Sequence, residues 1–227
     1  MTKSFIFLAS LFLLAGIQQT KAQNIDTLLD KGQDILEKGR IYSIKGIGMA
    51  FPIGSVSKVL RPRFSTEIGL QILMKNPRYF LYPTIDYVNF NYDQLYDDPK
   101  YNYRMKNASA KLYIGTLSGG LITQVKSFRI FSSAGIGGGI INEPRGWVDA
   151  EAGEINFQNR SSFTGTLRLN TGVDYGKRTF KLFAELSYLL QTRQIQGSNM
   201  HTLAVNIGTR TNLYRLARSI ETIKKKL

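Results

Sequence analysis

The spacing of the turns constrains the fold of this chain more than any other feature. Strand-like runs alternate with connections that are by turns long and short. The long connections are Pro52–Pro62, Asp93–Ala108, Asn142–Ser161 and Thr192–Met200, and the short ones lie around Lys75–Arg78, Thr123–Lys126 and Gly176–Arg178. This asymmetry is typical of an up-and-down barrel with two different rims, as in the bacterial outer membrane. It predicts an all-β, eight-stranded, antiparallel transmembrane barrel.

Residues 1–22 have the pattern of a secretory signal peptide. Lys3 precedes the apolar run Phe5–Ile17, and the small residues Thr20 and Ala22 place cleavage before Gln23. The alternative is a short transmembrane anchor, but the apolar run is too short to span a bilayer comfortably. The chain is therefore expected to enter the export pathway.

The two ends of the mature chain have helical periodicity. Residues 23–39 predict a periplasmic amphipathic helix, with apolar residues at helical spacing within Asn24–Lys38 and Gly39 as its stop. Residues 215–227 predict a basic helical tail. The barrel occupies 40–214, and an even number of strands puts both termini on the periplasmic side.

Composition excludes several classes of protein. Loss of the signal peptide removes Lys3 and Lys21 and lowers the net charge from +14 to about +12. The chain has no Cys, so it has neither disulfides nor a thiol metal site. An exported chain rarely meets nucleic acid, so the basic charge is expected to face lipid or a protein partner. No cofactor, metal or catalytic motif is found in the sequence.

The alternating strands predict two different faces of the sheet. In Arg63–Leu73, the residues Phe64, Ile68 and Leu70 share one face, while Glu67 and Gln71 share the other. Alternation is equally clear in Thr166–Tyr175, Phe180–Leu190 and Thr202–Leu213. It is weaker in Ile41–Phe51, Tyr79–Tyr92, Ala110–Ile122 and Phe128–Ile141, where Lys111 and Arg129 mark the polar phase of the last two.

Charged residues of both signs share the polar phase and are expected to form an ion-pair network in the lumen, the space inside the ring of strands. They are Glu67, Asp86, Lys111, Arg129, Arg168, Asp174, Lys181, Glu185 and Arg210. Aromatic residues near strand ends match the girdles of membrane barrels. Alternation alone also fits a secreted or periplasmic lipocalin-like barrel or sandwich, which would face its apolar side inward.

A barrel of eight strands is filled by its own side chains, which predicts a non-enzymatic protein with a structural, accessory or docking role. A narrow channel is one alternative. Another is a lipid A-modifying hydrolase that uses His201, the only histidine, with Ser187 or Ser198. The pattern of lipid A deacylases has Ser two residues after His on the same face, and in this chain that position is Leu203.

Two further segments are candidates for contacts outside the barrel. The tail has basic residues that are expected to contact periplasmic lipid headgroups or a protein partner, namely Arg215, Arg218, Lys224, Lys225 and Lys226. The third long connection is acidic through Glu143, Asp149, Glu151 and Glu154. It is expected to be solvated. The more specific alternative is that this connection recognises a partner or binds a divalent ion.

The mature chain resembles the small, porin-like outer-membrane β-barrel proteins of the OmpA/OmpX type in Gram-negative bacteria. The resemblance is carried by Thr20–Gln23, by the alternating strands and by Asn206-Ile207-Gly208 followed by Leu213 and Tyr214, which is similar to the signal for barrel assembly. The chain departs from that pattern at Thr211 and by continuing past Tyr214. The resemblance implies an outer-membrane location and contact with its lipids.

Overall fold

The barrel is built almost entirely from antiparallel strands. The computed structural model describes residues 39–94, 105–149, 151–152, 154–176 and 179–216, of which the backbone alone is described at 147–149 and 154–155. The strands are β1 (Ile41–Ile53), β2 (Leu60–Arg61), β3 (Arg63–Leu73), β4 (Tyr79–Tyr92), β5 (Ala108–Val125), β6 (Phe128–Asp149), β7 (Glu154–Gly176), β8 (Phe180–Ile195) and β9 (Ser198–Asn212). A 3-10 helix, η1 (Gly54–Lys58), follows β1.

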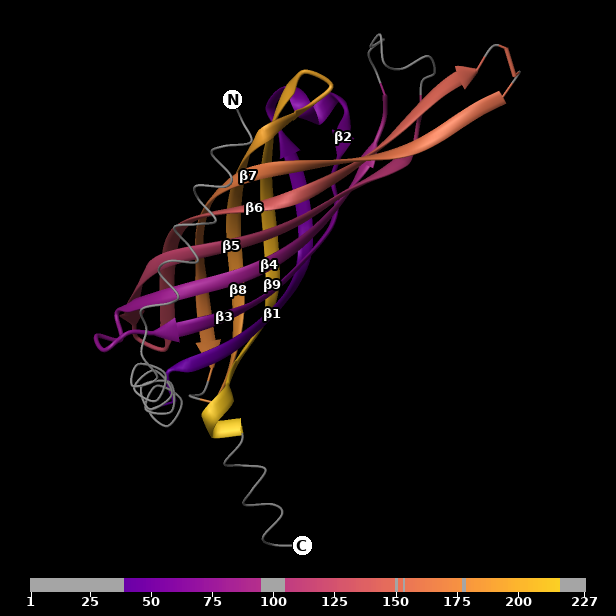
Figure 1. Cartoon of the computed structure of the whole chain (residues 1–227). Helices are drawn as coiled ribbons and strands as arrows, with labels where there is room; N and C mark the ends of the chain where they lie inside the picture. The colour runs from indigo at the N-terminus through magenta and orange to yellow at the C-terminus, as the bar shows by residue number, and fades with distance from the viewer. Residues whose placement is uncertain (1–38, 95–104, 150, 153, 177–178, 217–227) are drawn as a thin grey trace, which may run out of the picture. The chain divides into compact units, whose positions relative to one another are not determined.

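Eight of these strands form a closed ring. The hydrogen-bonded order is β4-β3-β1-β9-β8-β7-β6-β5, and β5 pairs with β4 to complete it (Figure 1). The first and last long strands meet along a seam that runs from Tyr42↔Asn212 to Ile53↔His201. The two-residue strand β2 pairs with the end of β4 through Leu60 and Arg61. The predicted eight-stranded, antiparallel, up-and-down barrel is therefore confirmed.

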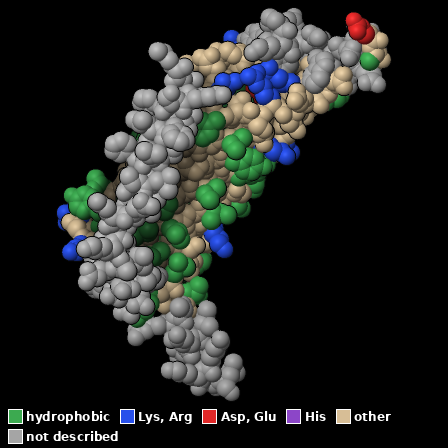
Figure 2. All heavy atoms as spheres, in the orientation of Figure 1, with side chains coloured by type: hydrophobic (Ala, Val, Ile, Leu, Met, Phe, Trp, Pro, Cys, Tyr) green, Lys and Arg blue, Asp and Glu red, His purple; other side chains and the backbone are tan. Residues whose placement is uncertain are grey.

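The outside of the ring is apolar and exposed. Ile136 is 72% exposed, Ile85 66% and Ile207 60%, and Figure 2 shows hydrophobic side chains gathered on the visible outer face of the strands. Arg168 and Glu67 are completely buried. This is the reverse of a water-soluble sandwich or lipocalin, whose apolar faces turn inward.

Two of the predicted long connections are strands instead. Within Asn142–Ser161, β6 and β7 keep pairing as far as Asp149↔Glu154 and continue as a two-stranded ribbon past the other strands (Figure 1). Within Thr192–Met200, β8 and β9 continue to a tight turn at Gln196 and Gly197, both with positive φ. Pairing satisfies backbone groups that a loop would leave to water, and polar side chains such as those of Asn142 and Ser161 do not prevent it.

The polar phase predicted for β5 is wrong. Leu112 and Ile114 are buried inside the ring, while Lys111 and Tyr113 are exposed on its outer side. Lys111 lies opposite Asn89 and Asn142, where the outer face has become polar. One charged residue at a strand end therefore does not identify the inner face of the strand.

Glycines allow β6 to lie close to β5. A Cβ added at Gly137 would lie 2.0 Å from the Gly115 carbonyl oxygen, and one at Gly139 would lie 2.1 Å from that of Tyr113. Pairing of β5 with β6 is continuous through this stretch. The glycine-rich run therefore serves close approach of two strands.

The terminal helices are supported only by one short turn. Residues 213–216 form this turn after β9, and the Asn212 side-chain oxygen accepts a hydrogen bond from the Arg215 amide at 3.0 Å. This N-cap ends the strand at Asn212, one residue earlier than predicted. The helix predicted over 23–39 falls, except for Gly39, outside the described residues, as does the tail beyond 216. Among the described residues, no helix is both long and apolar enough to cross a membrane.

The seam between β1 and β9 gives a test of ring closure. Ile47 and Ile207 are direct partners across it, and both face outward. In the double variant Ile47→Cys with Ile207→Cys, we expect oxidation to produce a disulfide, because directly opposed residues have Cα atoms about 4.5–5.5 Å apart, within the range that a disulfide bridges. The readout is a changed mobility of the denatured chain on non-reducing gels.

The control pairs Ile47→Cys with Ile136→Cys, which lies on β6, away from the seam. Equal crosslinking in the two double variants, or none at the seam, would contradict the closed ring.

Candidate functional site

The lumen holds the densest cluster of charged side chains in the described chain. Arg168 of β7 lies at its centre, completely buried. Its guanidinium donates to Asp86 Oδ2 at 2.6 Å, Glu185 Oε1 at 2.8 Å and Glu67 Oε1 at 3.0 Å. One cation thus serves three carboxylates, which come from β3, β4 and β8.

Neutral side chains donate further hydrogen bonds to these carboxylates. The Tyr82 hydroxyl donates to Glu67 in a very short contact and lies 3.3 Å from Glu185 Oε2. Asn206 donates to Glu67 Oε2 at 3.2 Å, and Asn170 donates to Glu185 Oε1 at 3.0 Å. Buried carboxylates are tolerated when their oxygens accept several hydrogen bonds. The arrangement is that of a structural network.

A second cluster lies toward the terminal end of the lumen, where β1 begins and β9 ends. Asp174 accepts from Arg129 at 2.5 Å and pairs with Arg210 at 3.0 Å. The Arg210 guanidinium lies 3.8 Å from the centre of the Phe131 ring, which is a cation–π contact. Arg210 also approaches Glu185 at 3.5 Å and so links the two clusters.

Apolar side chains fill the lumen around these charges. At the opposite end, called the loop end, buried residues from η1 and the neighbouring strands form one cluster that includes Val56, Phe90 and Leu112. At the terminal end, Ile44, Phe80 and Phe183 belong to a second cluster. The charged groups therefore lie in an interior filled by side chains.

The structure brings most of the predicted lumen residues together. Glu67, Asp86 and Glu185 meet on Arg168, while Arg129 and Arg210 meet on Asp174. Lys181 is half-buried at the terminal end, with its amino group 5.8 Å from the centre of the Tyr42 ring. Lys111 is outside the lumen, and its assignment to the network is wrong, because β5 turns its other face inward.

The residues suggested for a hydrolase are not brought together. Neighbouring β9 positions Thr202 and Ala204 point inward, so His201 points outward, and its Nδ1 lies 2.6 Å from the Tyr188 hydroxyl. Ser187 is buried inside, where it donates to Glu185 at 2.8 Å. Ser198 is also buried. Residues on opposite faces of one sheet cannot form a nucleophile–base pair.

The acidic connection departs from the expected solvated loop at Glu143, whereas Glu151 is exposed, and the side chains of Asp149 and Glu154 lie outside the described residues. Glu143 is buried on β6 and forms an ion pair with Arg145 at 2.7 Å. Within the described residues, no group of three or more His, Asp and Glu side chains could hold a metal ion. Of the predicted tail contacts, Arg215 is exposed, while Arg218 and Lys224–Lys226 lie outside the described residues.

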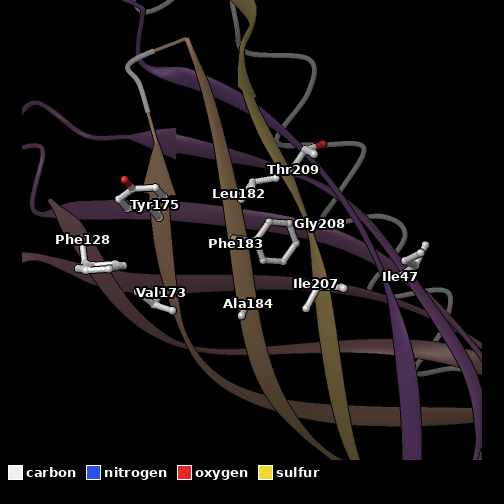
Figure 3. Close-up of a pocket in the computed structure, with 10 residues that line it drawn as sticks. All are labelled: Ile47, Phe128, Val173, Tyr175, Leu182, Phe183, Ala184, Ile207, Gly208 and Thr209. Atoms are coloured by element: carbon white, nitrogen blue, oxygen red, sulfur yellow. The ribbon is translucent and has the colours of Figure 1, made fainter.

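An apolar hollow of about 590 Å³ lies on the outer face near the terminal end (Figure 3). Phe128, Tyr175, Leu182 and Ile207 are among its lining residues, and Phe183 is seen between β8 and β9. None of the lining residues is charged. The hollow therefore belongs to the apolar outer surface and carries no catalytic group.

Comparisons with known proteins identify the fold. No protein-family model and no curated protein sequence matches this chain. Neisserial surface protein A has a similar crystal structure, with a TM-score of 0.52 and 17% identity over 76% of this chain and 97% of that chain. This chain has the fold of a small outer-membrane β-barrel. The resemblance seen in the sequence is thus confirmed at the level of the fold.

Two further structures match with lower scores. The N-terminal β-barrel domain of Pseudomonas aeruginosa OprF has a TM-score of 0.41 and 10% identity, over 75% of this chain and 97% of that domain. Ail, the attachment invasion locus protein of Yersinia pestis, has a TM-score of 0.36 and 11% identity, over 74% of this chain and 97% of its own.

Sequence reasoning missed the aromatic members of the lumen. Tyr82 contacts both Glu67 and Glu185, and Phe131 supports Arg210. A signal for Tyr82 was present, since it shares its strand phase with Asp86. Phe131 likewise shares its phase with Arg129. Both were overlooked because aromatic residues fit the outer face equally well.

Removing the central cation should strongly destabilise the barrel. Arg168→Met leaves three buried carboxylates without their main counter-charge, which we expect to cost about 3–5 kcal/mol of unfolding free energy. The measurement is urea unfolding of the refolded barrel in lipid vesicles, followed by far-ultraviolet circular dichroism.

Lys111→Met is the matched control, because Lys111 is exposed, and its effect should stay within about 0.5 kcal/mol. A loss below about 1 kcal/mol in Arg168→Met would contradict a central role for this guanidinium.

Proposed function

We propose that this chain is a non-enzymatic integral protein of the bacterial outer membrane, with both termini on the periplasmic side. The observation that carries this proposal is the inversion of the sheet, with exposed apolar side chains outside and a buried ionic network inside. A water-soluble monomer rarely exposes a continuous apolar patch larger than a few hundred Å². Outer-membrane lipids are the natural partners of this surface.

The interior supports a structural role better than transport. Arg168 and Arg210 are fully buried, and two clusters of buried apolar residues fill the lumen around their network. A pore needs a continuous wet path, and packed side chains remove it. The placement of His201 and Ser187 on opposite faces also argues against a lipid hydrolase, so the barrel serves as a scaffold.

The ribbon formed by β6 and β7 supports an accessory or docking role. Pairing of β7 with β8 starts at Thr166↔Gln191, so β7 between Glu154 and Phe163 extends beyond it. Phe157 is 64% exposed and Phe163 is 75% exposed. Open strand edges and exposed aromatic residues are common features of protein-binding surfaces. An envelope partner would dock here or on the basic C-terminal segment.

A single outward substitution distinguishes a membrane barrel from a soluble one. Leu169 faces outward in the middle of β7. Leu169→Arg should lower the unfolding free energy in lipid vesicles by about 2–4 kcal/mol, because it places a charge in hydrocarbon. Urea unfolding in vesicles measures this loss.

Gln158→Arg, on the exposed ribbon, is the control and should be close to neutral. A soluble lipocalin-like protein would tolerate both changes equally and would stay in the soluble periplasmic fraction after cell lysis. Either result would refute the proposed location.

The filled lumen predicts an absence of steady ion current. Purified barrel inserted into planar bilayers should leave the baseline conductance unchanged, because the charged network is sealed by packed side chains. Insertion is verified separately by the faster migration of unheated protein on detergent gels. Reproducible single-channel steps from inserted protein would instead support the narrow-channel alternative.

A further inference from the structure

The charges of the lumen are balanced in number but separated in position. Glu67, Asp86 and Glu185 surround Arg168, while Arg129, Arg210 and Lys181 lie toward the terminal end with Asp174. Arg210 also forms a longer ion pair with Glu185, with 3.5 Å between the nitrogen and oxygen atoms. The terminal end of the lumen therefore has an excess of positive charge.

This excess opens into a cup of about 540 Å³ at the terminal mouth. Arg78, Arg129 and Lys181 line it together with the apolar side chains of Leu73 and Ile122. Arg129 is only 8% exposed and is held by Asp174. Among the described residues, no carboxylate lies within ion-pair distance of Lys181 or Arg78. The cup thus combines two cations that form no ion pair with the described residues, a fixed guanidinium and an apolar wall.

We propose that this cup binds a phosphate group whose carrier contacts Leu73 and Ile122. A phosphate monoester carries between one and a half and two negative charges near neutral pH, about what Lys181 and Arg78 leave uncompensated. A guanidinium fork and an ammonium point charge are the usual protein ligands of phosphate. Partial burial of Lys181 and Arg129 reduces screening by salt.

The inference goes beyond the structural role and does not depend on it. In the proposed orientation the cup opens toward the periplasm. The phosphate can be carried by a soluble phosphomonoester or by a phospholipid headgroup of the adjacent leaflet, and both present the same chemistry to the cup.

The test uses the full mature chain, refolded in a zwitterionic detergent, with inorganic phosphate as the probe and calorimetry as the readout. We expect Lys181→Gln and Arg78→Gln each to weaken phosphate binding by about tenfold. Lys75→Gln is the matched control, because Lys75 lies on the same turn as Arg78 but does not line the cup. Its affinity should stay within about twofold of the unchanged chain.

A second arm identifies the source of the phosphate. Barrel in nanodiscs that contain phosphatidic acid is compared with barrel in phosphatidylcholine nanodiscs, and bound lipid is counted by mass spectrometry. Retention of phosphatidic acid that is lost in both cup variants supports a lipid source. Binding of inorganic phosphate without retention of phosphatidic acid supports a soluble source.

Three results would overturn the proposal. They are absence of binding in both arms, binding that survives both cup substitutions, and equal loss in Lys75→Gln, which would indicate general attraction to a basic rim. The gel-mobility shift on heating reports folding of each variant. Arg78 is an exposed turn residue, so Arg78→Gln provides a folded test even if Lys181→Gln fails to refold.

Discussion

The burial of Arg168 among three carboxylates is the interaction on which the barrel depends. In the ring order, β7 lies directly opposite β3, so the pair formed by Arg168 and Glu67 spans the lumen. Contacts to Asp86 and Glu185 tie the same guanidinium to two further strands. Desolvation of four charges is costly, and many hydrogen bonds are needed to offset it. The network therefore specifies one arrangement of the ring more than it adds net stability.

This network also determines which parts of the barrel are accessible to ligands and partners. Its sealed centre separates the loop end, with its apolar cluster and long ribbon, from the terminal mouth with its basic cup. Function in such a barrel is expected at the rims and on the outer surface, where side chains can meet partners and lipids.

The alternation of residues predicted the faces of most strands correctly. In β3, β7, β8 and β9 several polar residues share one phase, and all of these phases turn inward as expected. In β5 the inner face was inferred from one lysine, because small and apolar residues occur on both faces of this strand. The structure turns the opposite face inward. Loop lengths were overestimated for a related reason. Polar side chains along β6 and β7 resemble a loop, although their backbones pair as far as Asp149 and Glu154.

The sequence by itself determined the antiparallel strands, their number in the ring and, for most strands, which face turns toward the lumen. These properties follow from local turns and a two-residue period. Only the tertiary structure decided the partners of each buried charge. Arg168 meets Glu67 from a strand 101 positions away in the sequence, and no local pattern encodes that distance. Ring closure also formed the cup. Arg78, Arg129 and Lys181 belong to three separate segments, which become neighbours only when the last strand pairs with the first.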